Sequence, residues 1–255
     1  MIVAPDPDLI AARLRRWRAF LEWVDQHSDS AWVFRGMGDV DFRLLPSIGR
    51  VPNYSLARER SVLAGFRRAV PLHQSDNGFR DWEYLALAQH HGVPTRLLDW
   101  STNPLVAAYF AVSSTAGPRD VKMDGATVSA IPERSAVACR IVAIRVRRAQ
   151  MLDIESGRDP FSETQVRFLQ PRAISSRIGS QSGLFSLHPQ PNESWNAPLG
   201  KSEHVFDIIG EFRDFFVRRL FYLGVDPLYI MGGLDGLGAR AAWQAAKGVR
   251  VGVIS

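Results

Sequence analysis

Polar side chains are most concentrated between residues 88 and 103, where they separate two apolar segments. The residues there with charged or hydrogen-bonding side chains are Gln89, His90, His91, Arg96, Asp99, Ser101, Thr102 and Asn103. Loops carried on a rigid scaffold are common positions for binding and catalytic groups. This block is therefore the first place where we expect a functional site.

The charged residues of this block could bind a ligand or could serve only to stabilise the fold. Arg96 and Asp99 are near enough in sequence to form a local ion pair, which would brace the turn instead of binding a ligand. His90 and His91 are adjacent on an expected helix, so their side chains point in different directions. They lack the i, i+4 spacing of a zinc-binding pair, and we expect no metal site here.

Ser101 and Thr102 precede an expected helix that begins at Asn103-Pro104. The free backbone N–H groups of a helix start, together with two hydroxyls, could bind an anion. The simpler alternative is that Asn103 caps the helix and no ligand is involved.

Arg35 follows the apolar stretch Trp32-Val33-Phe34 and precedes Gly36. Arginine carries a permanent charge and is seldom fully buried without a partner. Either Arg35 has an internal carboxylate partner, or it faces a cleft and binds an anion, with Arg50 or Arg96 beside it.

The composition is that of an ordinary globular protein, with 46% hydrophobic and 22% charged residues among 255. The formal charge of +5 suits a phosphate-bearing partner but is too small to indicate nucleic-acid binding by itself. The lone cysteine, Cys139, excludes an internal disulfide and is expected to be a buried, inert thiol. We expect a cytoplasmic protein, because no signal-peptide pattern and no membrane-length apolar stretch is present.

Periodicity and capping residues predict the secondary structure. Helices are expected from Asp6-Pro7 to about Val24, at 55–69, at 80–91, from Asn103-Pro104 to about 114, at 205–224 and at 235–247. Extended segments are expected at 32–35, 94–100, 136–147 and 227–231, with a surface loop at 115–134 and irregular chain at 150–202. No regular alternation of strands and helices is present, so the fold class is α+β. One domain is expected over 1–255, with an N-terminal helix (1–29), a motif-bearing core (30–190) and C-terminal helices and strand (203–255).

Several blocks together resemble the FRG domain family, which is named after the sequence Phe34-Arg35-Gly36. The blocks are "WVFRG", "LLPSIGR", "AQHHGVPTRLLDWSTNPLVAAYFA", "RIGSQSGLFSLHP" and the closing "GGLDGLGARA". The chain departs from the family pattern at His91, where an aromatic residue is usual. It also has Gly232-Gly233 where the family has a Pro-Asp pair, with Asp235 as the nearest acid.

A second resemblance is to the ADP-ribosyltransferase superfamily. A strand ending in Arg-Gly, a Ser-Thr segment before a helix with "AAYFA", and a later polar residue in "SQSGLF" resemble its three motifs. The resemblance implies a split mixed or antiparallel sheet with surrounding helices, and NAD as the substrate without a metal.

The resemblance also assigns roles to residues. Arg35 would bind the dinucleotide, Ser101, Thr102 and Tyr109 would line the pocket, and Gln181 would orient the ribose, with Arg35 and Gln181 as the catalytic pair. Apart from the resemblance, we expect Thr95 and Arg96 as further pocket candidates, and we expect His90 and Asp99 to hold the central loop. A glutamate is usual in the third motif, so Glu163, Glu193 and Glu203 are alternatives to Gln181.

Two functions remain open. One is an NAD-dependent ADP-ribosyltransferase or NAD glycohydrolase, whose acceptor would be protein, nucleic acid or water. Such enzymes often act as toxins or antiphage effectors, so a neutralising partner protein is a further expectation. The other is a non-catalytic module that binds a nucleotide or nucleic acid in the same pocket, without a membrane partner. No P-loop and no G-x-G-x-x-G motif is present to offer a different phosphate site.

Overall fold

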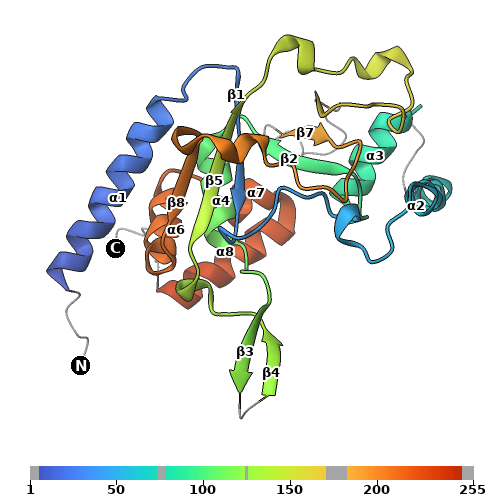
Figure 1. Cartoon of the computed structure of the whole chain (residues 1–255). Coiled ribbons are helices and arrows are strands. Elements are labelled where there is room, and N and C mark those ends of the chain that lie inside the picture. The colour runs from blue at the N-terminus through green and yellow to red at the C-terminus, as the bar shows by residue number, and fades with distance from the viewer. Residues whose placement is uncertain (1–5, 74–77, 124–125, 171–182, 249–255) are drawn as a thin grey trace.

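A six-stranded antiparallel sheet forms the centre of the molecule (Figure 1). The computed structural model describes residues 6–73, 78–123, 126–170 and 183–248. The strand order is β6-β7-β2-β1-β5-β8. The strands are β1 (Trp32–Met37), β2 (Leu97–Ser101), β5 (Cys139–Arg145), β6 (Arg167–Leu169), β7 (Gly183–Leu187) and β8 (Val205–Ile208). The predicted α+β class is therefore confirmed.

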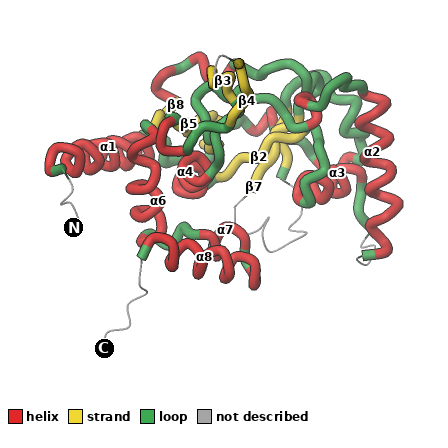
Figure 2. Tube along the Cα trace, turned by 90° about the horizontal axis from the view of Figure 1, so that it is seen from below, coloured by secondary structure: helices red, strands yellow, loops and turns green. Residues whose placement is uncertain are grey.

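Seven α-helices are described around the sheet. They are α1 (Pro7–Asp25), α2 (Leu56–Ala69), α3 (Asp81–His90), α4 (Pro104–Ser113), α6 (Arg213–Tyr222), α7 (Pro227–Met231) and α8 (Gly233–Lys247). Viewed from below, α4 lies between α1 and α6 on one side and α3 and α2 on the other (Figure 2). None of these helices has the length and apolarity that a membrane crossing requires.

Capping side chains explain where several helices begin. The Asp6 carboxylate accepts the N–H of Asp8, and Asn103 accepts the N–H of Leu105, with a proline in the first turn of each helix. These side chains satisfy amides that the helix itself cannot pair. The two predicted helix starts are confirmed.

Both faces of the sheet are covered. On one face, α1, α4 and α6 pack over β1, β5 and β8 around a cluster that includes Phe20, Phe34 and Phe216. On the other face, a second cluster joins Val33, Met37 and Trp100 with residues of later segments. A third cluster packs α3 against β2, β6 and β7. Because strand side chains alternate, Arg35 belongs to the face of Val33 and Met37.

Gly36 permits the close approach of β1 to α4. A Cβ atom at this position would lie 2.0 Å from the carbonyl oxygen of Ala107 and 2.5 Å from the backbone nitrogen of Ala111. Both contacts are with backbone, which cannot turn aside as a side chain can. The Phe-Arg-Gly sequence thus combines a buried aromatic, a charge and the space that α4 needs.

Four sequence predictions were wrong in detail. The predicted helix at 205–224 contains β8 followed by α6, because Phe206 and Ile208 are buried on one face while β8 pairs with β5. The predicted strand at 227–231 is helix α7, which Asp226 caps by accepting the N–H of Tyr229. The predicted loop at 115–134 carries a hairpin, β3 (Arg119–Met123) and β4 (Ala126–Ala130). The irregular region 150–202 supplies β6 and β7, which complete the sheet through tertiary pairing.

Candidate functional site

The sheet opens between β1 and β2. In the described part of the chain these two strands share one paired position, Phe34 with Ser101. By contrast, β1 pairs with β5 along its whole length from Trp32 to Met37, and β2 pairs with β7 from Leu97 to Ser101. Few backbone hydrogen bonds therefore join β1 to β2 beside the opening.

A cavity of about 430 Å³ occupies this opening, and we refer to it as the β1–β2 cavity. Its volume falls within the range of small-molecule sites, roughly 300–1,000 Å³. Its lining residues come from β1, β2, the end of α3 and α4: Phe34, Arg35, Gly36, Gln89, His90, Gly92, Asp99, Trp100, Ser101, Val106, Ala107, Phe110 and Ser114. Arg35 and Trp100 belong to the face opposite Phe34, yet they line the same cavity because the strands separate.

Arg35 has an internal carboxylate neighbour and also faces the cavity. Its Nη1 donates to the backbone oxygen of Asp99 over 2.5 Å and lies 3.7 Å from Asp99 Oδ2. The Arg35 side chain is 20% exposed and that of Asp99 is 58% exposed. Burial lowers the pKa of Arg35, Asp99 raises it, and the nearby charge of Arg50 lowers it. The two alternatives left open for Arg35 are therefore not exclusive.

Gln89 connects Asp99 to the buried residue Thr95. The Thr95 hydroxyl accepts the N–H of Leu97 over 3.2 Å and donates to Gln89 Oε1 over 2.6 Å. Gln89 Nε2 then donates to Asp99 Oδ2 over 3.0 Å. Thr95 is 1% exposed and does not line the cavity, so it lies behind the site.

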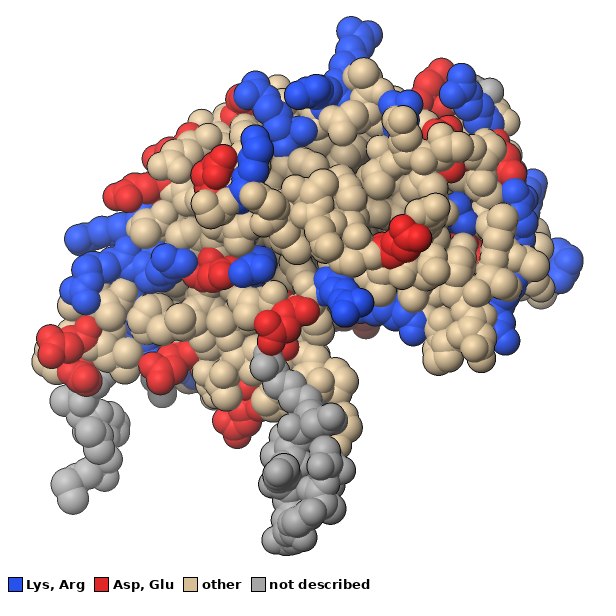
Figure 3. Space-filling model, in the orientation of Figure 1, with Lys and Arg blue, Asp and Glu red and all other residues tan. Residues whose placement is uncertain are grey.

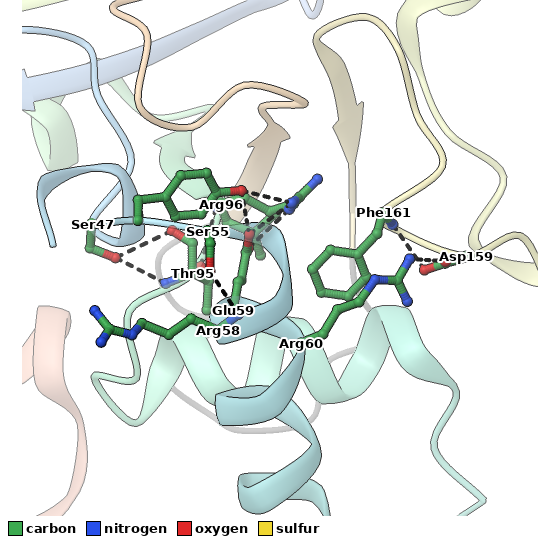
Figure 4. A network of polar contacts seen from close by, with 11 residues as sticks. Ser47, Ser55, Arg58, Glu59, Arg60, Thr95, Arg96, Asp159 and Phe161 are labelled. Atoms are coloured by element: carbon green, nitrogen blue, oxygen red, sulfur yellow. Dashed lines mark hydrogen bonds and ion pairs between the residues drawn. The ribbon is translucent and has the colours of Figure 1, made fainter. Parts of the chain in front are cut away.

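Arg96 is part of a buried ion pair with Glu59, which Figure 4 shows, and it is not among the residues that line the cavity. Its Nε and Nη2 donate to Glu59 Oε1 and Oε2 over 2.9 and 2.7 Å, and both side chains are 2% exposed. Tyr54 donates its hydroxyl to the same carboxylate, and the guanidinium stacks on Phe161. Of the two interpretations left open, the local pairing of Arg96 with Asp99 is not the one that the structure shows, because Glu59 of α2 is the partner of Arg96.

The residues at the start of α4 divide between capping and the cavity. Ser101 lines the cavity, and its hydroxyl accepts the N–H of Asn103 over 3.0 Å. Asn103 in turn caps the helix, so these amides already have protein partners. Thr102 is exposed and is not among the lining residues. Binding of an anion at this position would therefore depend on the charge of Arg35 more than on the backbone amides at the start of α4.

Tyr109 does not line the β1–β2 cavity. Tyr109 lies on another face of α4 and lines a separate cavity of about 220 Å³ with Trp243 and Phe221. Gln181 lies outside the described residues. His90 does line the β1–β2 cavity, whereas Glu163, Glu193 and Glu203 do not.

A hydrogen-bonded chain behind the cavity was not expected from the sequence. Trp100 Nε1 donates to Ser186 Oγ over 2.8 Å, and Ser186 Oγ lies 2.8 Å from His188 Nε2. An indole N–H can only donate, so Ser186 Oγ accepts from Trp100, and the tautomer of His188 sets which partner donates in the second contact. Burial, followed by the charge of Arg35, lowers the pKa of His188 to about 3. "SLHP" carries no local signal of this partnership, which depends on the pairing of β7 with β2.

The lone cysteine is buried, as expected. Cys139 is fully covered within β5, and burial raises the pKa of its thiol to about 11. A thiol of this kind is a poor nucleophile at neutral pH. Among the described residues, no group of three or more His, Cys, Asp or Glu side chains has the arrangement of a metal site.

Comparison with known proteins identifies one region of the chain. No curated protein and no solved structure matches the chain. Residues 30–119 match the family model described as FRG domain, which extends from the residues before β1 past the end of α4. Residues 30–119 are therefore similar to the FRG domain, and every residue that lines the β1–β2 cavity lies within this matched region.

Proposed function

We propose that the β1–β2 cavity binds NAD and that the protein transfers ADP-ribose from NAD or hydrolyses it. The observation that carries this proposal is the arrangement of Arg35 and Asp99, a cation and a carboxylate that line one cavity at an opening of the sheet. A dinucleotide offers a complementary pattern, because its pyrophosphate is anionic and its ribose develops positive charge during glycosidic cleavage.

The bond changes are the same for transfer and hydrolysis. The bond between C1′ of the ribose and the nicotinamide nitrogen breaks, and both bonding electrons leave with nicotinamide. The oxygen of water or of an acceptor then adds to C1′ and releases a proton. An enzyme accelerates such a step when fixed charges stabilise the oxocarbenium-like transition state more than the substrate.

Three groups of this cavity have roles in that scheme. Arg35 binds the pyrophosphate, assisted by the positive charge of Arg50 nearby. Phe110, in place of the predicted Tyr109, offers an aromatic contact for nicotinamide. Asp99 places negative charge beside the reacting ribose. Gln181 remains a proposed contact to the ribose from outside the described residues.

A non-catalytic nucleotide-binding module is the second candidate. It is favoured by the absence of glutamate among the described residues that line the cavity, because a glutamate is usual in the third motif. Extended nucleic-acid binding has less support on the face shown in Figure 3. There, acidic side chains are interspersed among basic ones and do not leave a continuous basic stripe.

NAD turnover separates the two candidates. Wild-type protein and Arg35→Gln are incubated with NAD and with protein, RNA or DNA acceptors, and free nicotinamide and acceptor mass are measured. Nicotinamide release that depends on Arg35 supports the enzyme, and added ADP-ribose mass identifies the acceptor. Binding of NAD without nicotinamide release in any mixture supports the second candidate.

We also propose that the activity serves as a toxin or antiphage effector controlled by a neutralising partner. Expression of the wild type should then slow growth of a host, whereas Arg35→Gln should not. Equal growth of cells expressing the two proteins at equal levels would count against this role.

A further inference from the structure

We infer that Asp99 recognises the hydroxyls of a ribose in the β1–β2 cavity, and that Gln89 and Thr95 are the positioning residues that hold its carboxylate. This inference rests on the proposed function and identifies the ribose hydroxyls as the part of the ligand that the site recognises. We predicted the opposite roles from the sequence, with Thr95 in contact with the ligand and Asp99 behind it. In the structure Thr95 is 1% exposed and the Asp99 side chain is 58% exposed.

The Asp99 carboxylate retains capacity to accept hydrogen bonds. Its Oδ2 accepts from Gln89, whereas Oδ1 accepts no hydrogen bond from any described residue. The separation of 3.7 Å between Arg35 Nη1 and Oδ2 exceeds hydrogen-bond length, and Nη1 donates to the Asp99 backbone oxygen instead. The two charges therefore lie side by side without a closed hydrogen-bonded pair, and each can still bind a ligand group.

The orientation of Gln89 follows from its buried partner. The Thr95 hydroxyl accepts the N–H of Leu97 and donates its single proton to Gln89 Oε1. This contact directs the amide oxygen of Gln89 toward Thr95 and its NH₂ group toward Asp99. Three successive hydrogen bonds therefore run in one direction, from the N–H of Leu97 to Thr95, from Thr95 to Gln89, and from Gln89 to Asp99.

An adjacent cation and carboxylate match a ribose phosphate. The guanidinium binds phosphate oxygens, and a carboxylate can accept hydrogen bonds from two neighbouring hydroxyls. An analogue that lacks these hydroxyls forgoes hydrogen bonds to a charged group, which are stronger than hydrogen bonds between neutral groups. The expected ligand is therefore a ribonucleotide, with weaker binding of the deoxy form.

The test measures the affinity of the full chain for ADP-ribose by titration calorimetry. Two analogues are compared with it, one lacking the 2″- and 3″-hydroxyls of the terminal ribose and one lacking the 2′- and 3′-hydroxyls of the adenosine ribose. We expect wild-type protein to bind one of the two analogues about 10- to 100-fold more weakly than ADP-ribose. Asp99→Asn should reduce that difference to less than about threefold.

Thr95→Val and Thr95→Ser form a matched pair for the positioning role. Valine removes the hydroxyl that orients Gln89 and should reduce the discrimination, whereas serine retains the hydroxyl and should preserve it. If both variants retain the wild-type discrimination, the positioning role is wrong. This comparison does not depend on Asp99→Asn being folded, and neither does the wild-type measurement.

The outcomes distinguish this inference from the function on which it rests. If wild-type protein binds ADP-ribose and both analogues equally, Asp99 does not read hydroxyls, although the cavity remains a nucleotide site. If wild-type protein binds neither ADP-ribose nor NAD, the proposed function fails and the inference fails with it. Discrimination that is lost in Asp99→Asn and kept in Thr95→Ser supports the inference.

Discussion

Replacement of Glu59 by leucine should destabilise the protein severely. Glu59 and Arg96 are each 2% exposed, and the carboxylate accepts two hydrogen bonds from Arg96 and one from Tyr54. The substitution leaves the Arg96 guanidinium buried without its counter-charge. Breaking a buried pair in this way costs about 3–5 kcal/mol of the free energy of unfolding. In a protein of this size the melting temperature should fall by about 10 °C.

The effect can be measured by urea unfolding, followed by circular dichroism, beside two matched variants. Arg67→Met removes an exposed pair in which Arg67 and Asp81 are each 52% exposed, and it should cost no more than about 1 kcal/mol. The double variant Glu59→Leu, Arg96→Met removes both buried charges and should recover much of the stability lost in Glu59→Leu. A loss below about 1 kcal/mol in Glu59→Leu would refute this account of Arg96.

Two further predictions concern β1 and the buried histidine. Gly36→Ala should destabilise the protein by about 1–3 kcal/mol in urea unfolding, since its Cβ would overlap the α4 backbone. Gly65→Ala, in the middle of α2 with no atom within 4 Å of its Cβ, should be neutral or stabilising by up to about 1 kcal/mol; equal costs for the two glycines would contradict the close-approach argument. The pKa of His188, lowered to about 3, predicts that its contribution to stability is complete above the ordinary pKa and declines as pH falls toward 3, because the unfolded chain takes up the proton first. Between pH 7 and pH 5 the free energy of unfolding should fall by about 2 kcal/mol more in wild type than in His188→Gln, and parallel pH profiles of the two proteins would show that the histidine does not titrate as argued.

Local signals in the sequence predicted the features that depend on a few neighbouring residues. Asp6-Pro7 and Asn103-Pro104 begin helices because each cap contacts an amide two residues away. Cys139 was expected to be buried from the apolar strand around it, and it is. Arg35 could be singled out because a charge after three apolar residues requires a partner or a ligand.

Features that depend on contacts between distant segments could not be predicted from the local sequence. Arg96 pairs with Glu59, 37 residues earlier, and the nearer Asp99 is taken by Arg35 and Gln89. The helical pattern at 205–224 was broken because β8 gains its backbone partners from β5. The resemblance to ADP-ribosyltransferases placed Tyr109 in the pocket, whereas the structure places it on another face of α4, where it lines a separate cavity. In each case contacts between segments distant in the sequence determined the structure, and the local sequence could not predict them.

The most direct test of the central claim is the affinity of Arg35→Gln for ADP-ribose beside that of the wild type. Glutamine keeps an N–H donor for the Asp99 carbonyl and removes the charge, and Arg67→Met serves as the control for loss of a remote arginine. The account predicts that Arg35→Gln binds about 10- to 100-fold more weakly, with a melting temperature within a few degrees of wild type, while Arg67→Met binds as wild type does. Equal affinity of the wild type and Arg35→Gln would contradict the claim that Arg35 is the anion-binding group of the β1–β2 cavity.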